Sequence, residues 1–199
     1  ASSTAKAIQS ATSTLLDAIF ASRAGNNRRF ADIYNRVLLR RLQPLLQNHL
    51  IPRVQAMIIL GQSGYSEALP VFLNQIKDPN QPALVKLWAF RGISNLKKPG
   101  RAVLPANIEI NAAKGIAEEL DNDKSLPWPA QLRGLEALGD LRHGHTATSP
   151  KSLEMASVAM KFLNDPKAKP EIRAEAARAL GLMQISAVVT DYNYDAIAT

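Results

Sequence analysis

An apolar residue recurs at positions i, i+3 and i+6 in four short segments of the chain, an interval typical of one face of an α-helix. The last apolar residues of these segments lie 36, 42 and 42 residues apart, at Leu60, Leu96, Leu138 and Leu180. Each segment also has a small residue between its first two apolar positions, at Ala56, Gly92, Gly134 and Ala176. Small residues allow a neighbouring helix to approach closely. The pattern therefore predicts four related helices, each packed tightly against a neighbour.

A second helical pattern precedes each of these four segments. The upstream patterns cover residues 33–46, 66–78, 107–120 and 152–165. Proline stands between the two patterns in every case, at Pro52, Pro82, Pro127 and Pro170. Proline presets the angle of a first helical turn and prevents the preceding helix from continuing. The repeating unit is therefore predicted to be a helical hairpin.

Stacked hairpins share one continuous core, whereas a single hairpin cannot bury both sides of its apolar stripe. This unit resembles a HEAT repeat, with Pro44 or Pro70 in the first helix, an Asp-Pro turn, and a small residue and a Leu-Gly pair in the second helix. The resemblance implies an all-α superhelix, a solenoid of about four HEAT-like hairpins. Lys97 replaces the glycine in one copy, and the linkers at 99–106 and 142–151 are long, so we expect irregular curvature.

The pattern divides the chain into three parts. Residues 1–30 are predicted to form an N-terminal capping helix and a linker, because Ile8, Leu15 and Ile19 fall at helical intervals before the Gly25-Asn26-Asn27 stop. Residues 31–185 form the HEAT-like repeat domain. Residues 186–199 lack the repeat pattern, and we expect a tail or a partial repeat there.

Composition limits the chemistry. The 199 residues are 46% hydrophobic, which is enough for a folded core, and the chain has no cysteine, which excludes disulfides and thiolate sites. No apolar run approaches the roughly 20 residues that cross a bilayer. The net charge of +7 is uneven, because residues 1–110 carry 14 basic against 5 acidic residues (+9) and residues 111–199 carry 10 against 12 (−2). A basic front half can mark a surface for nucleic acid, anionic lipid or an acidic protein, although a solvated basic face is the simpler interpretation.

No motif indicates an enzyme, and we expect no catalytic residue, metal or cofactor. His143 and His145 offer too few ligands for a zinc site, and GQSG at 61–64 is interpreted as a turn, because it follows a helix rather than a strand. An acidic group after the third upstream pattern is interpreted as a solvated surface rather than an acid/base pair: Glu118, Glu119, Asp121 and Asp123.

Nucleic-acid binding is the main alternative, because some HEAT-like proteins are DNA glycosylases. Trp88 and Trp128 are the aromatic candidates for such a role, although both are interpreted as packing between repeats. The basic front half would supply phosphate contacts through Arg28, Arg29, Arg36, Arg40, Arg41, Arg53, Lys97, Lys98 and Arg101. A purely structural segment of a larger secreted protein is a third alternative.

The resemblance implies that the second helices line the inner face of the stack. Positions beside their apolar stripes carry charges of alternating sign, which suits a protein or peptide partner better than nucleic acid. The predicted partner-binding residues are Gln55, Arg91, Arg133, Glu136 and Arg178. The plainer alternative is that these charges pair with one another. The sequence leaves the compartment, secreted, periplasmic or cytoplasmic, and the oligomeric state open.

Overall fold

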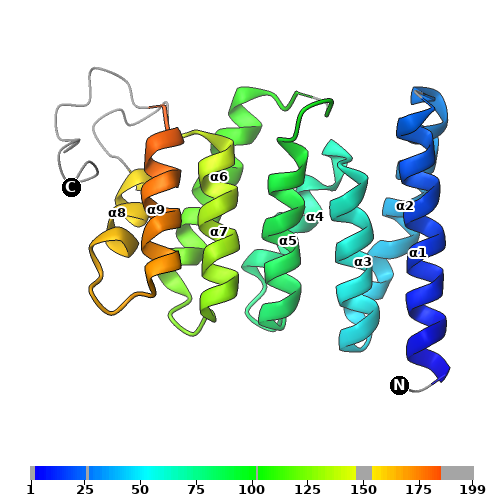
Figure 1. Ribbon diagram of the computed structural model, residues 1–199, viewed down its shortest axis with the longest axis horizontal. Coiled ribbons are helices and arrows are strands. Elements are labelled where there is room, and N and C mark those ends of the chain that lie inside the picture. The colour runs from blue at the N-terminus through cyan, green and yellow to red at the C-terminus, as the bar shows by residue number, and fades with distance from the viewer. Residues whose placement is uncertain (1–2, 26, 102, 147–153, 185–199) are drawn as a thin grey trace. The chain divides into compact units, whose positions relative to one another are not determined.

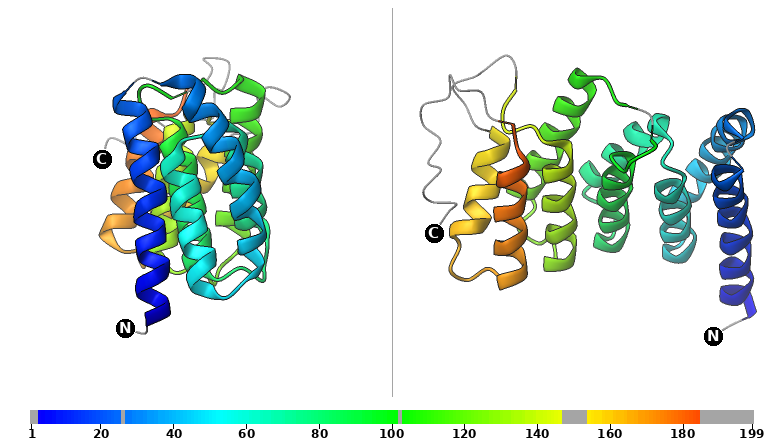
Figure 2. Two further views of the ribbon diagram at one scale, coloured as in Figure 1. Left: turned by 90° about the vertical axis from the view of Figure 1, so that its right-hand side faces the viewer. Right: turned by 45° about the horizontal axis from the view of Figure 1, so that its top comes forward.

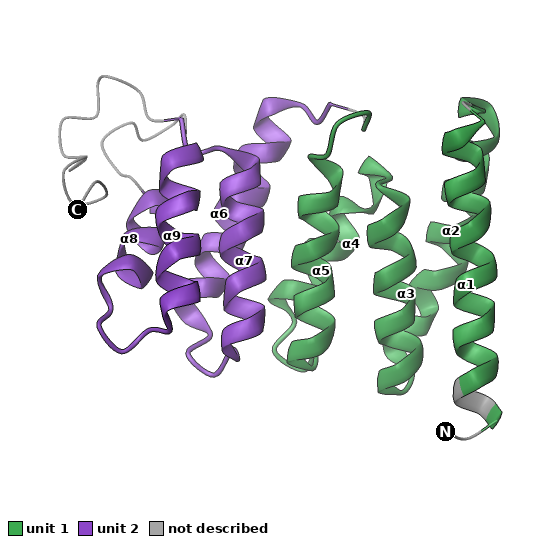
Figure 3. Cartoon of the chain, in the orientation of Figure 1, with its two compact units in different colours: residues 1–102 green, residues 103–199 purple. Residues whose placement is uncertain are grey.

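A computed structural model describes residues 3–25, 27–101, 103–146 and 154–184. These residues belong to two compact units, Ala1–Ala102 (unit 1) and Val103–Thr199 (unit 2) (Figure 3). Within the described ranges the chain is helical, with an isolated bridge between His143 and Gln184 and no strand, which confirms the all-α prediction. No helix in these ranges is both long and apolar enough to span a membrane. The predicted tail at 186–199 lies outside the described residues.

Unit 1 is a two-layered group of helices (Figures 1 and 2). In one layer α3 packs between α1 and α5, and these three helices run side by side in the same direction. In the other layer α2 continues into the 3₁₀ helix η1, which packs on α3, and α4 packs on α5. The elements are α1 (Ser3–Ala24), α2 (Arg28–Leu42), η1 (Gln43–Gln47), α3 (Leu50–Ser63), η2 (Ser66–Ala68), α4 (Leu69–Lys77) and α5 (Ala83–Leu96).

Unit 2 consists of two helical hairpins. Helix α6 pairs with α7 and α8 pairs with α9, while α7 packs beside α9 and α6 beside α8. The helices are α6 (Ala106–Asn122), α7 (Trp128–Leu141), α8 (Glu154–Asn164) and α9 (Pro170–Leu182). The four predicted second helices are thus α3, α5, α7 and α9. Helix α3 packs against α5, and α7 packs against α9.

Proline sets the helix boundaries, as predicted, but not always at the predicted place. Helix α9 begins at Pro170 and α7 follows directly after Pro127, where the fixed φ of proline suits a helix start. Pro44 and Pro70 were expected inside the first helices. Because proline has no N–H to donate, α2 instead changes to a 3₁₀ helix around Pro44, and Pro70 lies in the first turn of α4.

The predicted small residues face the first helix of their own hairpin. A Cβ atom on Gly92 would lie 2.8 Å from the ring of Phe72 on α4. A Cβ atom on Gly134 would lie 2.7 Å from a methyl group of Leu120 on α6. Phe72 and Leu120 are buried, so their side chains fill the space above each glycine. The small position therefore lets a large side chain pack across each hairpin.

In two of the Leu-Gly pairs the glycine, Gly61 or Gly139, faces the next second helix instead. A Cβ atom on Gly61 would lie 3.1 Å from the Cα atom of Gly92, and one on Gly139 would lie 2.8 Å from the Cα atom of Ala179. At the corresponding position of α9, Gly181 has no atom within 4 Å of such a Cβ. The backbones of α3 and α5 are thus in close contact, and so are those of α7 and α9.

Because of the contact between α7 and α9, substitution by alanine should change the stability of the protein in opposite directions at two aligned glycines, Gly139 and Gly181. Gly139→Ala forces its new methyl group against the backbone at Ala179, so we expect it to lower the free energy of unfolding by about 1–3 kcal/mol. Gly181→Ala meets open space and should raise it by up to about 1 kcal/mol, because alanine is the better helix former. Urea unfolding followed by circular dichroism measures both, and equal effects would contradict the close approach.

Candidate functional site

The five predicted partner-binding residues all lie on second helices, divided between the two units. Gln55 on α3 and Arg91 on α5 belong to unit 1, and both are half-buried. Arg133 and Glu136 on α7 and Arg178 on α9 belong to unit 2.

The charges in unit 2 are neutralised within the unit. Arg133 pairs with Glu136 one turn further along α7. Arg178 contacts the Glu175 carboxylate at 2.7 Å on its own helix and reaches Asp140 on α7 at 3.4 Å. Arg178 also donates to the backbone oxygen of Glu136 at 3.3 Å. The contacts of Arg178 with Asp140 and Glu136 tie α9 to α7, whereas the other two pairs lie within one helix, so here the plainer alternative, pairing among the charges themselves, is what the geometry favours.

The matching surface of unit 1 is apolar and aromatic instead. Trp88 is half-buried on α5, and the guanidinium carbon of Arg91 lies 5.2 Å from its ring centroid. Ile51 on α3 is 49% exposed and Leu84 on α5 is 45% exposed. The spacing i, i+4, i+7 occurs on both helices, so each set shares one helix face. We call this set the unit 1 second-helix surface: Ile51, Gln55, Ile58, Leu84, Trp88 and Arg91.

Trp128 is partly covered within unit 2. It is the first residue of α7 and is 42% exposed, with the Lys169 ammonium 5.1 Å from its ring centroid. Lys169 directly precedes α9, so the ring contacts the next hairpin while part of it stays in solvent. The lysine covers one face of the ring and leaves its charge in water.

The histidine and acidic candidates take part in contacts inside unit 2. His143 Nε2 lies 3.3 Å from the carboxylate of Glu109, which is buried, so His143 takes part in a contact between the segment after α7 and α6. Asp121 contacts the ammonium of Lys161 on α8 at 2.8 Å, and this hydrogen bond lowers the pKa of Asp121. Among the described residues, no three His, Asp or Glu side chains lie close enough together to hold a metal ion.

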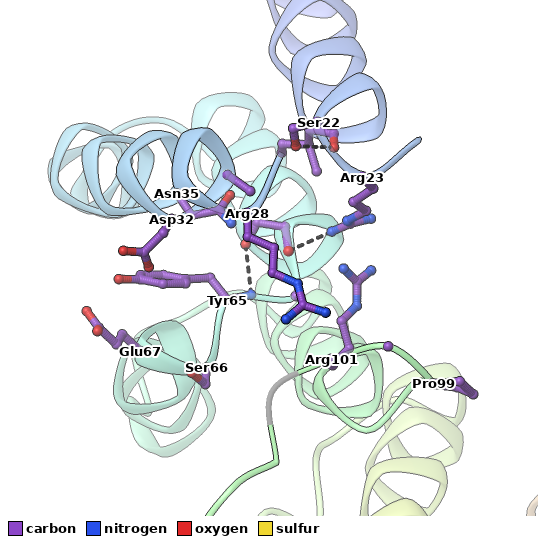
Figure 4. A pocket seen from close by; sticks show the side chains of 15 residues that line it. Ser22, Arg23, Arg28, Asp32, Asn35, Tyr65, Ser66, Glu67, Pro99 and Arg101 are labelled. Atoms are coloured by element: carbon purple, nitrogen blue, oxygen red, sulfur yellow. Dashed lines mark hydrogen bonds between the residues drawn. The ribbon is translucent and has the colours of Figure 1, made fainter. Parts of the chain in front are cut away.

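Sequence reasoning missed a polar cavity in unit 1 with a volume of about 650 Å³. Residues of α1, α2 and the segments that follow α3 and α5 line it (Figure 4). Arg23, Arg28 and Arg101 gather on one side, and Asp32 and Glu67 lie on the other (Figure 4). We call this cavity the arginine pocket. No sequence signal could have found it, because Arg101 comes from a segment far along the chain from Arg23 and Arg28.

Arg23 and Arg101 are held in the arginine pocket by the end of α3. Arg23 lies in the last turn of α1 and donates to the backbone oxygens of Gln62 and Ser63, the latter at 2.6 Å. A helix leaves these last carbonyls without an internal partner, so Arg23 completes α3. Gly64 follows with a φ of 57°, and a Cβ atom there would lie 2.5 Å from Arg101 Nε. Glycine is therefore required at position 64 both by the backbone and by Arg101.

The basic side of the arginine pocket is electrostatically strained. Burial, together with the neighbouring charge of Arg101, lowers the pKa of Arg23 to about 10. Burial also lowers the pKa of Arg101. Arg101 Nε is buried without a hydrogen-bond partner among the described residues. Arg28, in the first turn of α2, is exposed.

Comparison of the chain with protein-family models, with curated proteins and with solved structures finds no match.

The ion pairs of unit 2 predict a weak coupling between α7 and α9. In a double-mutant cycle of Asp140→Asn and Arg178→Gln, we expect a coupling below about 1 kcal/mol, because the Arg178 side chain is 40% exposed. Urea unfolding at low and high salt measures it, and the coupling should shrink as salt increases. A coupling that is larger and insensitive to salt would mean that this pair is not solvent-screened.

Proposed function

We propose that this chain is a non-enzymatic protein-interaction module that binds a segment of another protein on the unit 1 second-helix surface. The proposal includes the finer architecture, in which the hairpins stack as a HEAT-like solenoid and present their second helices as one curved face. One observation carries it: Trp88 lies half-buried under Arg91 on α5, and Leu84 on the same helix and Ile51 on the neighbouring α3 are both exposed.

This combination of residues is typical of the centre of a protein interface. Tryptophan and arginine are enriched among residues whose truncation weakens binding most, and charged residues other than arginine are depleted there. Arg91 covers the Trp88 ring and can also pair with a partner's carboxylate. Gln55 and Ile58 add a hydrogen-bonding group and apolar area beside it.

The packing beneath this surface supports the proposal. The contact between Gly61 and Gly92 fixes α3 against α5, so the residues of the surface are held before a partner arrives. A surface that is ordered in advance loses little conformational entropy on binding. Arg133, Glu136 and Arg178 already pair within unit 2, and in this proposal they contribute a polar rim rather than the main affinity.

The test compares two tryptophans that each lie beside a cation. A photo-crosslinking residue at Gln55 identifies the bound protein in extracts of the source cells, and purified protein then gives the affinity. Trp88→Ala should weaken binding by about 30-fold or more, and Arg91→Glu should also weaken it. Trp128→Ala is the matched control and should change affinity little.

Circular dichroism establishes whether each variant is folded before affinities are compared. Folded Trp88→Ala and Arg91→Glu variants that bind the crosslinked protein as tightly as the unaltered chain would overturn the assignment of this surface.

Nucleic-acid binding is the second candidate, and the exposed face of α2 favours it. Unit 1 has 14 basic against 4 acidic residues, a balance of +10. On α2, Phe30 and Ile33 are exposed, and Phe30 stacks on Tyr34 with ring centroids 5.4 Å apart. Exposed arginines accompany them at positions 29, 36, 40 and 41. Aromatic rings beside positive charges are what single-stranded nucleic acid contacts without sequence preference.

A salt series decides this second candidate. If α2 contacts phosphates, the affinity for a single-stranded oligonucleotide should fall steeply with salt, and Arg40→Gln with Arg41→Gln should reduce the slope of log K against log salt by roughly 1–2. Fluorescence anisotropy measures this. Lys124→Gln in unit 2, whose ammonium already pairs with Asp121, is the control, and a flat salt response would remove the candidate.

A further inference from the structure

The arginine pocket brings together three positive charges that the fold leaves without carboxylate partners. Arg23, Arg28 and Arg101 come from the end of α1, the start of α2 and the segment after α5. In the described part of unit 1, Arg28 and Arg101 form no salt bridge, and Arg23 donates to neutral backbone oxygens and lies 5.8 Å from the centroid of the Phe20 ring. Figure 4 shows the three guanidinium groups directed toward a common region. Neighbouring like charges repel one another. An anion placed among the three guanidinium groups would therefore offset the repulsion between them.

The donors in the arginine pocket suit an oxyanion with several acceptor atoms. Guanidinium groups form paired hydrogen bonds to phosphate, and these are stronger than bonds between neutral groups. Arg101 Nε is buried without a partner, and Arg23 uses only one of its terminal nitrogens on α3. The first turn of α2, which carries Arg28, lines the cavity and adds the positive end of its helix dipole.

The size and the opposite wall of the cavity indicate what else the ligand carries. A volume of about 650 Å³ falls in the range of small-ligand sites, so the ligand extends well beyond a phosphate group. Asp32, Asn35, Ser66 and Glu67 line the remaining wall and offer acceptor atoms for hydroxyl or amino groups. Asp32 already pairs with Arg36 at 3.2 Å through Oδ2, so Asp32 Oδ1 and the Glu67 carboxylate are the acidic acceptors that this wall offers a ligand.

From these observations we infer that the arginine pocket binds a small phosphorylated compound that also bears hydroxyl or amino groups. Arg23, Arg28 and Arg101 hold its phosphate, and the wall with Asp32 and Glu67 receives its hydrogen-bond donors. The site shares no residue with the unit 1 second-helix surface, so the inference stands apart from the proposed function.

Isothermal titration of the full chain at constant ionic strength tests the inference with three probes: inorganic phosphate, glycerol 3-phosphate and O-phosphoethanolamine. We expect all three to bind, and the two organic phosphates to bind more tightly than inorganic phosphate. Arg28→Gln and Arg101→Gln should each weaken binding about tenfold or more, because each removes charge-assisted hydrogen bonds. Arg29→Gln is the matched control, since Arg29 neighbours Arg28 but does not line the cavity.

Thermal unfolding without ligand separates binding from folding. Arg28 is exposed and unpaired, so Arg28→Gln should leave the midpoint unchanged, and Arg101→Gln should not lower it, because it removes repulsion against Arg23. Trp88→Ala should leave phosphate binding intact, whatever its effect on a protein partner.

Three outcomes would overturn the inference. One is that the unaltered chain binds none of the free phosphate compounds at millimolar concentration. Another is that Arg29→Gln weakens binding as much as Arg28→Gln does. The third is that vesicles containing phosphatidic acid, or a single-stranded oligonucleotide, bind through Arg28 and Arg101 while the free compounds do not.

Discussion

Close contact between second helices is the constraint on which both units depend. Gly61 meets the backbone of Gly92, and Gly139 meets that of Ala179, at separations that a side chain would prevent. This approach sets the spacing of α3 and α5, and with it the distance between the faces that carry Ile58 and Trp88. It also brings Asn95 on α5 within 3.2 Å of the Gly61 backbone oxygen, which helps to satisfy the end of α3. The unit 1 second-helix surface is therefore a consequence of this packing.

The end of α3 shows how a structural need places charge. Its last carbonyls require donors, and Arg23 supplies them from α1. Arg101 then lies against Gly64, which ends the helix, and the two guanidinium groups lie near one another in a partly buried setting. Asn95, a neutral donor, satisfies the preceding carbonyl, that of Gly61, without such repulsion. The arginines thus leave two positive charges close together, which the inferred phosphate ligand would offset.

The hairpins and their boundaries could be predicted because they depend on local spacing and on proline. Periodicity fixed which face of α7 is buried, and Gly134 indicated that another helix comes close there. The partner of that glycine could not be predicted, since Leu120 reaches it only once the hairpin has closed. The candidate site was predictable only in part: Gln55 and Arg91 lie on α3 and α5, two of the predicted second helices, whereas Arg178 is engaged by Asp140, which lies 38 residues earlier in the chain.

By itself, the sequence determined that this chain is all-helical, built from repeated hairpins and basic in its front half, because helix period, proline and composition act over short distances. Tertiary structure alone decided which charges are neutralised, which tryptophan faces solvent and where three arginines meet. Burial and Coulomb interactions depend on distances between segments that are far apart in the chain, and no local pattern encodes those distances.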